Sequence, residues 1–186
     1  FMDREMVAAL ERAMAELGVH LHLGRPWGAV TLGPDGKSVH TRLGEDTLVT
    51  HHLLFAAGRT GRTADLGLEH VGIRPNARGL LDVDAFYRTS VPHVLAAGDV
   101  IGFPALASTS MEQARVAVCH AFGFDYKKSV SGTLPYGIYT IPELSSVGES
   151  EESARAAGLD VAVGRAFYRE NARGQITGDT EGITKL

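Results

Sequence analysis

Two continuous apolar runs, each ending on glycine, constrain the fold of this chain more than any other feature of its sequence. Residues 53–58 read LLFAAG and residues 94–98 read VLAAG. A run without polar alternation predicts a strand that is buried on both faces, as in a parallel sheet covered by helices. Each run therefore predicts a central strand that brings its glycine to the carboxyl edge of a sheet, where open α/β folds bind ligands.

The segment before the first run predicts one helix and several short strands. Apolar residues from Met6 to Leu17 recur at helical spacing behind Asp3, which is a good N-cap residue, and Gly18 is a natural stop. Alternating patterns and turns with Gly, Pro and Asp then predict short strands at residues 19–23, 30–32, 38–41 and 47–49.

The segment around the second run predicts further strands and a helix. Residues 79–83 and 86–89 have the pattern of short strands. Thr109 followed by Glu112 has the spacing of a capping box and predicts a helix start. A face of small residues would let this helix lie close to a sheet, and it comprises Ala114, Ala117, Val118 and Ala121.

From residue 133 onward the pattern changes, and a polar stretch at residues 127–134 is the predicted link. Residues 150–157 predict a short helix with Glu151 and Glu152 at its N-terminus, where the helix dipole favours acidic side chains. Strands are predicted within residues 137–147, 161–168, 175–178 and 182–186. The chain is therefore predicted to be α/β in its first part and α+β, with an antiparallel sheet, in its second.

The clearest chemical signal is the Gly98-Asp99 pair, followed by a helix near Thr109. A buried strand that ends in this pair places a carboxylate at a sheet edge, and the glycine lets a ligand approach the backbone. The helix adds free N–H groups and the positive end of its dipole. Such a site suits a polyhydroxylated, partly anionic ligand, although an ordinary turn and helix cap remain an open interpretation of these few residues.

Four segments in this order make the chain resemble the flavin-dependent pyridine nucleotide disulfide oxidoreductases: residues 55–59, 94–99, 106–107 and 139–148. The resemblance implies three domain pieces. Residues 1–62 would be the C-terminal part of an NAD(P)-binding domain, and residues 63–132 the returning segment of an FAD-binding domain, both Rossmann-like. Residues 133–186 would begin an interface domain that forms a homodimer.

The same resemblance implies FAD and NAD(P) as cofactors and assigns the residues that hold them. Asp99 would hydrogen-bond the ribitol of FAD, while the backbone at Ala107 and the helix start would face the flavin ring. Gly58 would lie against the nicotinamide nucleotide, with Arg59 as a polar contact. The implied cofactor-binding residues are Gly58, Arg59, Gly98, Asp99, Leu106, Ala107, Ser108 and Thr109, and none is assigned a catalytic role.

Residues 98–108, 137–148 and 172–176 are similar to the transhydrogenase subgroup of that family. This similarity implies hydride transfer between NADPH and NAD through FAD. A dihydrolipoamide dehydrogenase-like disulfide reductase and a non-catalytic assembly fragment stay open as alternatives. No G-x-G-x-x-G fingerprint occurs in the chain. We therefore expect a fragment of a longer enzyme that is inactive alone.

Composition indicates which classes of binding partner the chain is not expected to have. A net charge of -4 with scattered charges of both signs predicts no nucleic-acid partner. No apolar run reaches membrane-spanning length, and the one cysteine, Cys119, cannot form an internal disulfide, so we expect a cytoplasmic protein that is not bound to a membrane. Cys119 is predicted to be a packed thiol, and neither histidine pair, 20 and 22 or 51 and 52, is predicted to bind metal.

Overall fold

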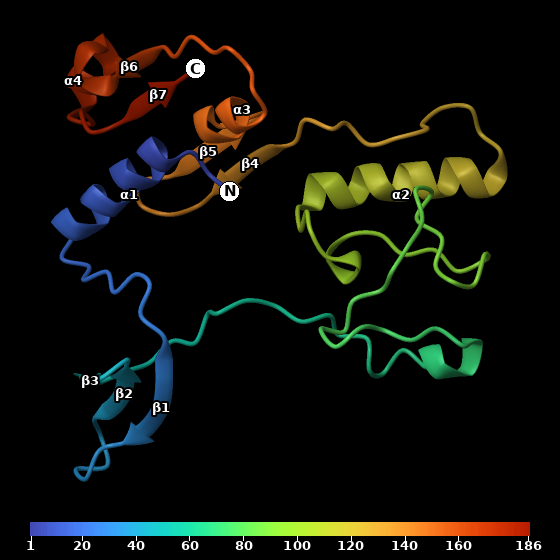
Figure 1. Ribbon diagram of the computed structural model, residues 1–186, viewed down its shortest axis with the longest axis horizontal. Coiled ribbons are helices and arrows are strands. Elements are labelled where there is room, and N and C mark those ends of the chain that lie inside the picture. Colours follow the sequence, from blue (N-terminus) through green and yellow to red (C-terminus); the bar gives the residue numbers. More distant parts are fainter. The chain divides into compact units, whose positions relative to one another are not determined.

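The computed structural model describes residues 1–186 and divides the chain into two compact units (Figure 1). Unit 1 comprises Phe1–Ala57, Ile138–Leu144 and Glu149–Leu186. Unit 2 comprises Gly58–Gly137 and Ser145–Gly148. The two ends of the chain therefore fold together in unit 1, while the middle of the chain makes up most of unit 2.

Helix α1 (Arg4–Glu16) opens unit 1 as predicted. The Asp3 carboxylate caps it, because Oδ1 accepts the backbone N–H of Glu5 at 2.9 Å and of Met6 at 3.3 Å. Gly18 follows the helix with a φ of 85°, a left-handed conformation that favours glycine.

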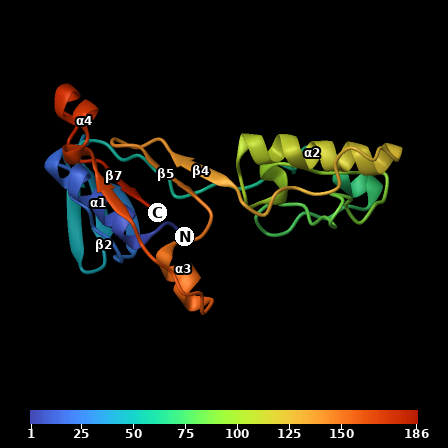
Figure 2. The same cartoon turned by 90° about the horizontal axis from the view of Figure 1, so that it is seen from above.

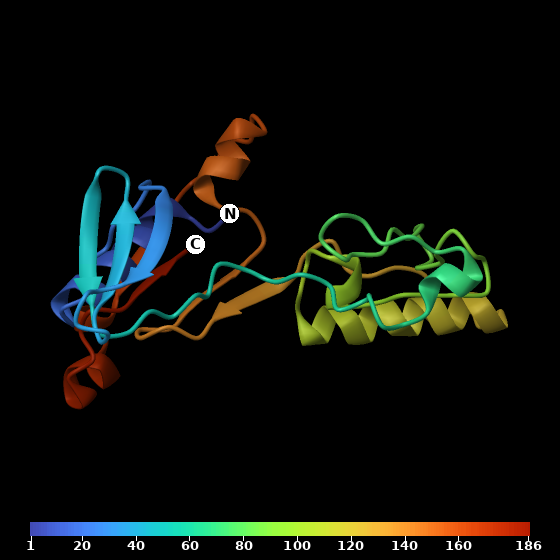
Figure 3. The same cartoon turned by 90° about the horizontal axis from the view of Figure 1, so that it is seen from below.

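Three strands form an antiparallel sheet in the order β1 (Trp27–Leu32), β2 (Val39–Leu43) and β3 (Asp46–Thr50), seen edge to edge in Figure 3. Between β1 and β2 the Asp35 carboxylate accepts hydrogen bonds from the backbone N–H groups of Ser38 and Lys37, which lower the pKa of Asp35 to about 2. Three of the four short strands predicted here are confirmed. The fourth, residues 19–23, forms no strand, because no neighbouring strand pairs with it.

Unit 2 is built around helix α2 (Ala107–Phe122), which lies along irregular chain segments (Figure 2). Two short 3-10 helices, η1 (Leu68–Val71) and η2 (Asp99–Ile101), interrupt those segments. Ile73, Leu81 and Ala96 form a small buried core. Most of this unit is therefore held by turns and loops rather than by a sheet.

The two apolar runs are not strands in this structure, and neither are residues 79–83 and 86–89. A single antiparallel bridge between Arg88 and Leu95 is all the pairing that the second run makes. The first run is exposed, with Leu54 88% accessible. A central strand needs hydrogen-bonding neighbours on both sides, whereas no strand pairs with the first run and only the short bridge at Arg88 pairs with the second.

Helix α2 begins earlier than predicted and without the predicted capping box. Leu106 is its N-cap, no side chain caps it, and Ser110 N–H already donates to the Leu106 carbonyl. Thr109 lies inside the first turn, and Glu112 forms ion pairs with Arg115 and Lys127 instead. The predicted small-residue face is also only partly used, since Ala117 is buried whereas Ala114, Val118 and Ala121 are exposed. The helix packs instead through a neighbouring face that carries Thr109, Gln113 and Val116.

The last part of the chain confirms most of the α+β pattern. Ser150 caps α3, and the capping box there is completed by Ser153. Residues 175–178 were predicted as a strand but lie at the end of helix α4. Asn171 caps this helix, and Gly174 packs closely against the Tyr168 carbonyl. A Cβ at position 174 would lie 2.3 Å from the Tyr168 carbonyl oxygen. The elements are β4 (Pro135–Ile138) paired with β5 (Leu144–Val147), α3 (Glu151–Ala156), β6 (Arg165–Phe167), η3 (Tyr168–Glu170), α4 (Ala172–Thr177) and β7 (Ile183–Lys185), which pairs with β6.

None of the helices is both long and apolar enough to cross a bilayer.

Candidate functional site

The site residues predicted from the sequence all lie in unit 2, and the turn at Gly98 and Asp99 is bound directly to helix α2. The buried Gly98 N–H donates to Gln113 Oε1 at 2.7 Å. Only the oxygen of the Gln113 amide can accept this proton, so the hydrogen bond sets the orientation of the amide group. The turn therefore keeps a defined position on the side of α2, within the first two turns of the helix.

Gly98 is required in this turn for two reasons. Its φ is 85° and its ψ is -155°, a backbone conformation that residues other than glycine rarely adopt. A Cβ at this position would also lie 2.5 Å from Ser110 Oγ. The turn and the helix thus meet at a distance that leaves no room for a side chain.

Asp99 follows immediately and opens η2 with an exposed carboxylate. Arg59 Nη1 lies 2.8 Å from Asp99 Oδ2, an ion pair between residues 40 positions apart. The Arg59 side chain is 82% exposed, so solvent screens the pair and it adds little to stability. The structure thereby brings together two residues that the resemblance had placed against different cofactors, while Gly58 beside Arg59 is exposed.

The N-terminus of α2 offers backbone donors at the same place. Ala107 and Ser108 are exposed in the first turn, and no side chain caps the helix. The first N–H groups of a helix have no partner within it and form the positive end of its dipole. A carboxylate at Asp99 and these donors are together suited to a ligand with hydroxyl groups and negative charge.

Thr109 has a different position from the one expected. Its side chain is 2% exposed, and Oγ1 has no hydrogen-bond partner in the protein. Together with Gln113, four residues later, it lies on the face of α2 that packs against the rest of unit 2. Thr109 therefore lies on the packed face of the helix and not on its exposed surface.

Sequence reasoning missed Gln113 and Ser110. A detectable signal did exist for Gln113, because it is a polar residue one helical turn from Thr109 on a face otherwise made by Val116, Ala117 and Cys119. No such signal marks Ser110, whose importance comes only from its closeness to Gly98.

Other candidate chemistry lies apart from this turn. No group of three or more His, Cys, Asp or Glu side chains is arranged to hold a metal ion, and Cys119 is buried as a free thiol. A pocket near the C-terminal end of α2 is lined in part by Cys119, Lys127 and Lys128. Both lysines already form ion pairs, with Glu112 and Asp125, so the pocket offers no unpaired cation for a ligand.

Two family models match the chain. Residues 1–121 match the model described as pyridine nucleotide-disulphide oxidoreductase. Residues 134–186 match the model described as the dimerisation domain of pyridine nucleotide-disulphide oxidoreductase.

Curated relatives match over the full length of the chain. The soluble pyridine nucleotide transhydrogenase of Hahella chejuensis is 44% identical over 186 residues, covering 100% of this chain and 40% of the relative. The proteins of the same name from Chromohalobacter salexigens and Mycobacterium tuberculosis are 41% and 42% identical, covering 100% of this chain and 40% and 39% of the relatives. This chain therefore spans about two fifths of the length of the curated relatives that it matches.

Solved structures are also similar to nearly the whole of this chain, which again covers about two fifths of each of them. LpdA from Mycobacterium tuberculosis superimposes with a TM-score of 0.87 at 29% identity, covering 100% of this chain and 40% of that one. The HOCl-induced flavoprotein disulfide reductase RclA from Escherichia coli gives a TM-score of 0.88 at 29% identity, with 98% and 42% coverage.

Proposed function

Because this chain belongs to the pyridine nucleotide-disulphide oxidoreductase family, we propose that it is part of a flavin-dependent enzyme that transfers hydride between NADPH and NAD. The observation that carries this proposal is the identity of 41–44% over all 186 residues to proteins named soluble pyridine nucleotide transhydrogenase. The activity is proposed for the longer protein, since the chain covers only 40% of such a relative.

The residues present fit FAD. An exposed carboxylate, a glycine turn without room for a side chain and an uncapped helix start lie next to one another in unit 2. FAD, when bound, would supply the hydride acceptor and donor that links the two nucleotides. The chain's own contribution is to bind and orient it.

Each part of the site has a proposed role. Asp99 accepts a hydrogen bond from a ribitol hydroxyl. The backbone N–H groups at Ala107 and Ser108 lie at the positive end of α2 and would face the flavin, where they would favour negative charge. We assign Gly58 and Arg59 to the nicotinamide nucleotide, although the Arg59 guanidinium pairs with Asp99 in this structure. Leu106, Gly98 and Thr109 shape the turn and the helix start rather than donate to the cofactor.

A disulfide reductase is the second candidate, favoured by the likeness to RclA, whose name describes such an enzyme. Its identity of 29% is well below the 44% shared with a transhydrogenase. The only cysteine here, Cys119, is buried in α2, so the cysteine pair of a reductase would have to come from other parts of the protein. Finding such a pair in the complete protein would favour this second candidate.

The domain division is also proposed. Residues 1–62 would belong to an NAD(P)-binding domain, residues 63–132 to an FAD-binding domain and residues 133–186 to an interface domain that pairs with a second copy. The match of residues 134–186 to a dimerisation-domain model supports the pairing. A cytoplasmic location agrees with the unpaired Cys119.

The test is a visible absorption spectrum of the purified chain after FAD is added and free flavin is removed by gel filtration. We expect retained flavin bands, and an affinity weakened about tenfold or more in Asp99→Ala, because a hydrogen bond to a charged group contributes roughly 1.5–3 kcal/mol. Asp125→Ala is the control, since Asp125 is an exposed carboxylate of the same unit that pairs only with Lys128. Equal flavin binding by Asp99→Ala and the parent chain would remove Asp99 from the site.

A further inference from the structure

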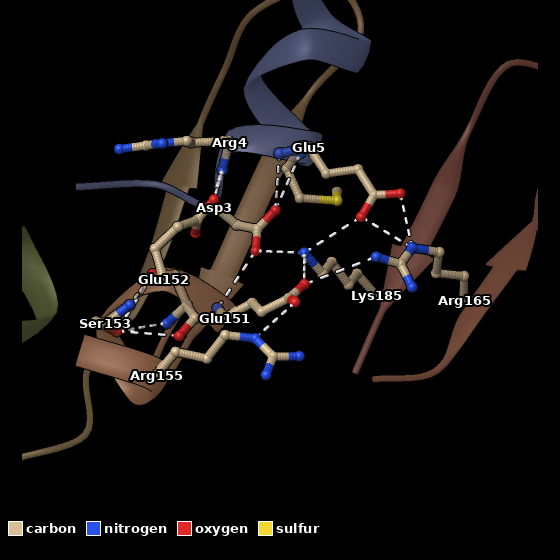
Figure 4. A network of polar contacts seen from close by, with 11 residues as sticks. Asp3, Arg4, Glu5, Glu151, Glu152, Ser153, Arg155, Arg165 and Lys185 are labelled. Atoms are coloured by element: carbon tan, nitrogen blue, oxygen red, sulfur yellow. Dashed lines mark hydrogen bonds and ion pairs between the residues drawn. The ribbon is translucent and has the colours of Figure 1, made fainter. Parts of the chain in front are cut away.

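Helix α1 meets the C-terminal part of the chain at a junction of charged groups within unit 1 (Figure 4). The N-termini of α1 and α3 face each other there. The Glu151 N–H at the start of α3 donates to Asp3 Oδ2 at 3.4 Å. In return, the Arg4 N–H at the start of α1 donates to Glu152 Oε1 at 3.2 Å. The N–H groups at the start of a helix have no acceptor within their own helix. Here each helix provides a carboxylate that accepts a hydrogen bond from such an N–H group of the other helix.

Asp3 divides its two oxygens between these tasks. Oδ1 caps its own helix, while Oδ2 accepts hydrogen bonds from Glu151 N–H and from the Lys185 ammonium, the latter at 2.7 Å. Burial acts to raise the pKa of Asp3, but the hydrogen bonds from Lys185, Met6 and Glu151 outweigh it and lower the pKa below its usual value. Asp3 is therefore held in its charged form, which is the form that all of these contacts require.

Lys185 of β7 lies at the centre of the junction. Its Nζ is 2.7 Å from Asp3 Oδ2, 2.8 Å from Glu151 Oε2 and 3.2 Å from Glu5 Oε2. These three acceptors match the three N–H groups of an ammonium. The side chain is 9% exposed, so the contacts are screened much less than those of a surface pair.

Two arginines complete the charge balance. Arg165 of β6 contacts Glu5 at 2.7 Å and Glu151 at 3.6 Å, and Arg155 of α3 contacts Glu151 at 2.9 Å. The carboxylates of residues 3, 5, 151 and 152 are thus opposed by Lys185 and the two arginines. The two helix N-termini add about half a positive charge each, so the junction is close to neutral.

We propose that this junction docks α1 onto segment 149–186, so that the two fold as one cooperative body. The proposal is independent of FAD binding. It concerns two segments that separate family models match, residues 1–121 and residues 134–186. The partner of the α1 N-terminus is therefore the dimerisation-domain region of the same chain, and Lys185 is the residue that holds them together.

Hydrogen exchange measured by mass spectrometry on the full chain tests the proposal. In Lys185→Met the carboxylates of Asp3, Glu5 and Glu151 lose their shared cation and repel one another. We expect the α1 amides to exchange about tenfold faster or more, since removing one partner of a poorly solvated ion pair is strongly destabilising. The β1–β3 amides should keep their rates. The control is Lys128→Met, which removes an exposed lysine of unit 2.

A second pair of variants decides the matter if Lys185→Met unfolds the whole chain. Glu152→Ala removes the acceptor of the Arg4 N–H, whereas Glu149→Ala removes a neighbouring carboxylate that contacts only Ser153. Faster exchange in the first turn of α1 for Glu152→Ala alone supports the junction. Unchanged α1 exchange in Lys185→Met, or equal exchange in Glu152→Ala and Glu149→Ala, overturns it.

Discussion

At the scale of single residues, position 98 is expected to accept only glycine without a loss of stability. Gly98→Ala would force a residue with a Cβ into a φ of 85° and place that Cβ 2.5 Å from Ser110 Oγ. We expect the free energy of unfolding to fall by about 1–3 kcal/mol, the usual cost of one strained backbone position.

Urea unfolding of matched variants separates the two causes. Gly132 has no neighbour within 4 Å of a built Cβ and no left-handed φ, so Gly132→Ala should leave stability unchanged. The double variant Gly98→Ala with Ser110→Ala should recover the part of the loss that is due to Ser110 Oγ, while the contact with the Cβ of residue 110 at 3.1 Å and the backbone strain remain. Equal stability of Gly98→Ala and the parent chain would show that the turn relaxes freely.

Gln113 and Thr109 make an informative contrast, because both are buried polar residues on one face of α2. Gln113→Leu leaves the Gly98 N–H buried without an acceptor, which costs roughly 1–3 kcal/mol. Thr109→Val removes a hydroxyl that has no partner, so stability should stay the same or rise. Urea unfolding of the two variants checks this, and a larger loss for Thr109→Val than for Gln113→Leu would contradict it.

At the scale of elements, the junction of α1 and α3 should give the chain a defined pH range of stability. Hydrogen bonds from Lys185 lower the pKa of Glu151, those from Arg165 lower the pKa of Glu5, and Asp3 is shifted in the same direction. Carboxylates with a lowered folded pKa stabilise the fold above their unfolded values, near pH 4, and lose that contribution as the pH falls further.

Lys185 sets the upper limit of that range. Burial acts to lower its pKa, but Asp3, Glu151 and Glu5 raise it well above the usual value. Its contribution is therefore complete below its unfolded pKa of about 10.4 and declines only at higher pH. We expect unfolding midpoints in urea to be flat from about pH 5 to pH 9 and to fall below about pH 4, more steeply in the parent chain than in Lys185→Met. Parallel acid profiles of the two proteins would contradict this expectation.

Elements with local signals were predictable from the sequence. Asp3 before α1, Ser150 before α3 and the turn at Asp35 each place a specific side chain against its own neighbouring backbone, and these elements formed as expected. The runs at residues 53–58 and 94–98 failed as strands because pairing depends on distant chain, and an apolar pattern does not supply a partner.

The candidate site was predictable in part for the same reason. The Gly98-Asp99 turn and a helix close behind it follow from neighbouring residues. The ion pair of Arg59 with Asp99 and the hydrogen bond from Gly98 to Gln113 join residues 40 and 15 positions apart, and neither pattern is visible along the chain. Likewise, α4 replaced a predicted strand because the Asn171 side chain caps it.

At the scale of the whole molecule, α2 carries an uncovered apolar face. Met111, Val118 and Phe122 are exposed on it, with Phe122 71% accessible. Contiguous apolar surface of this kind promotes association. We expect sedimentation velocity to show self-association that grows with concentration and is weakened in a variant with Met111→Lys and Val118→Lys. Leu66→Lys, at an exposed position outside helix α2, is the control. A monomer at every concentration would contradict the prediction.

The contacts of Asp3 also limit which substitutions this sequence can accept during evolution. One carboxylate caps its own helix and binds partners 148 and 182 positions along the chain. Replacing Asp3 by Asn could keep the cap but would leave Lys185 with one anion fewer, so a tolerated change at one position calls for a matching change at the others. A recombination event that exchanged only the final segment would separate partners adapted to each other, and lineages should therefore retain or replace the two ends together.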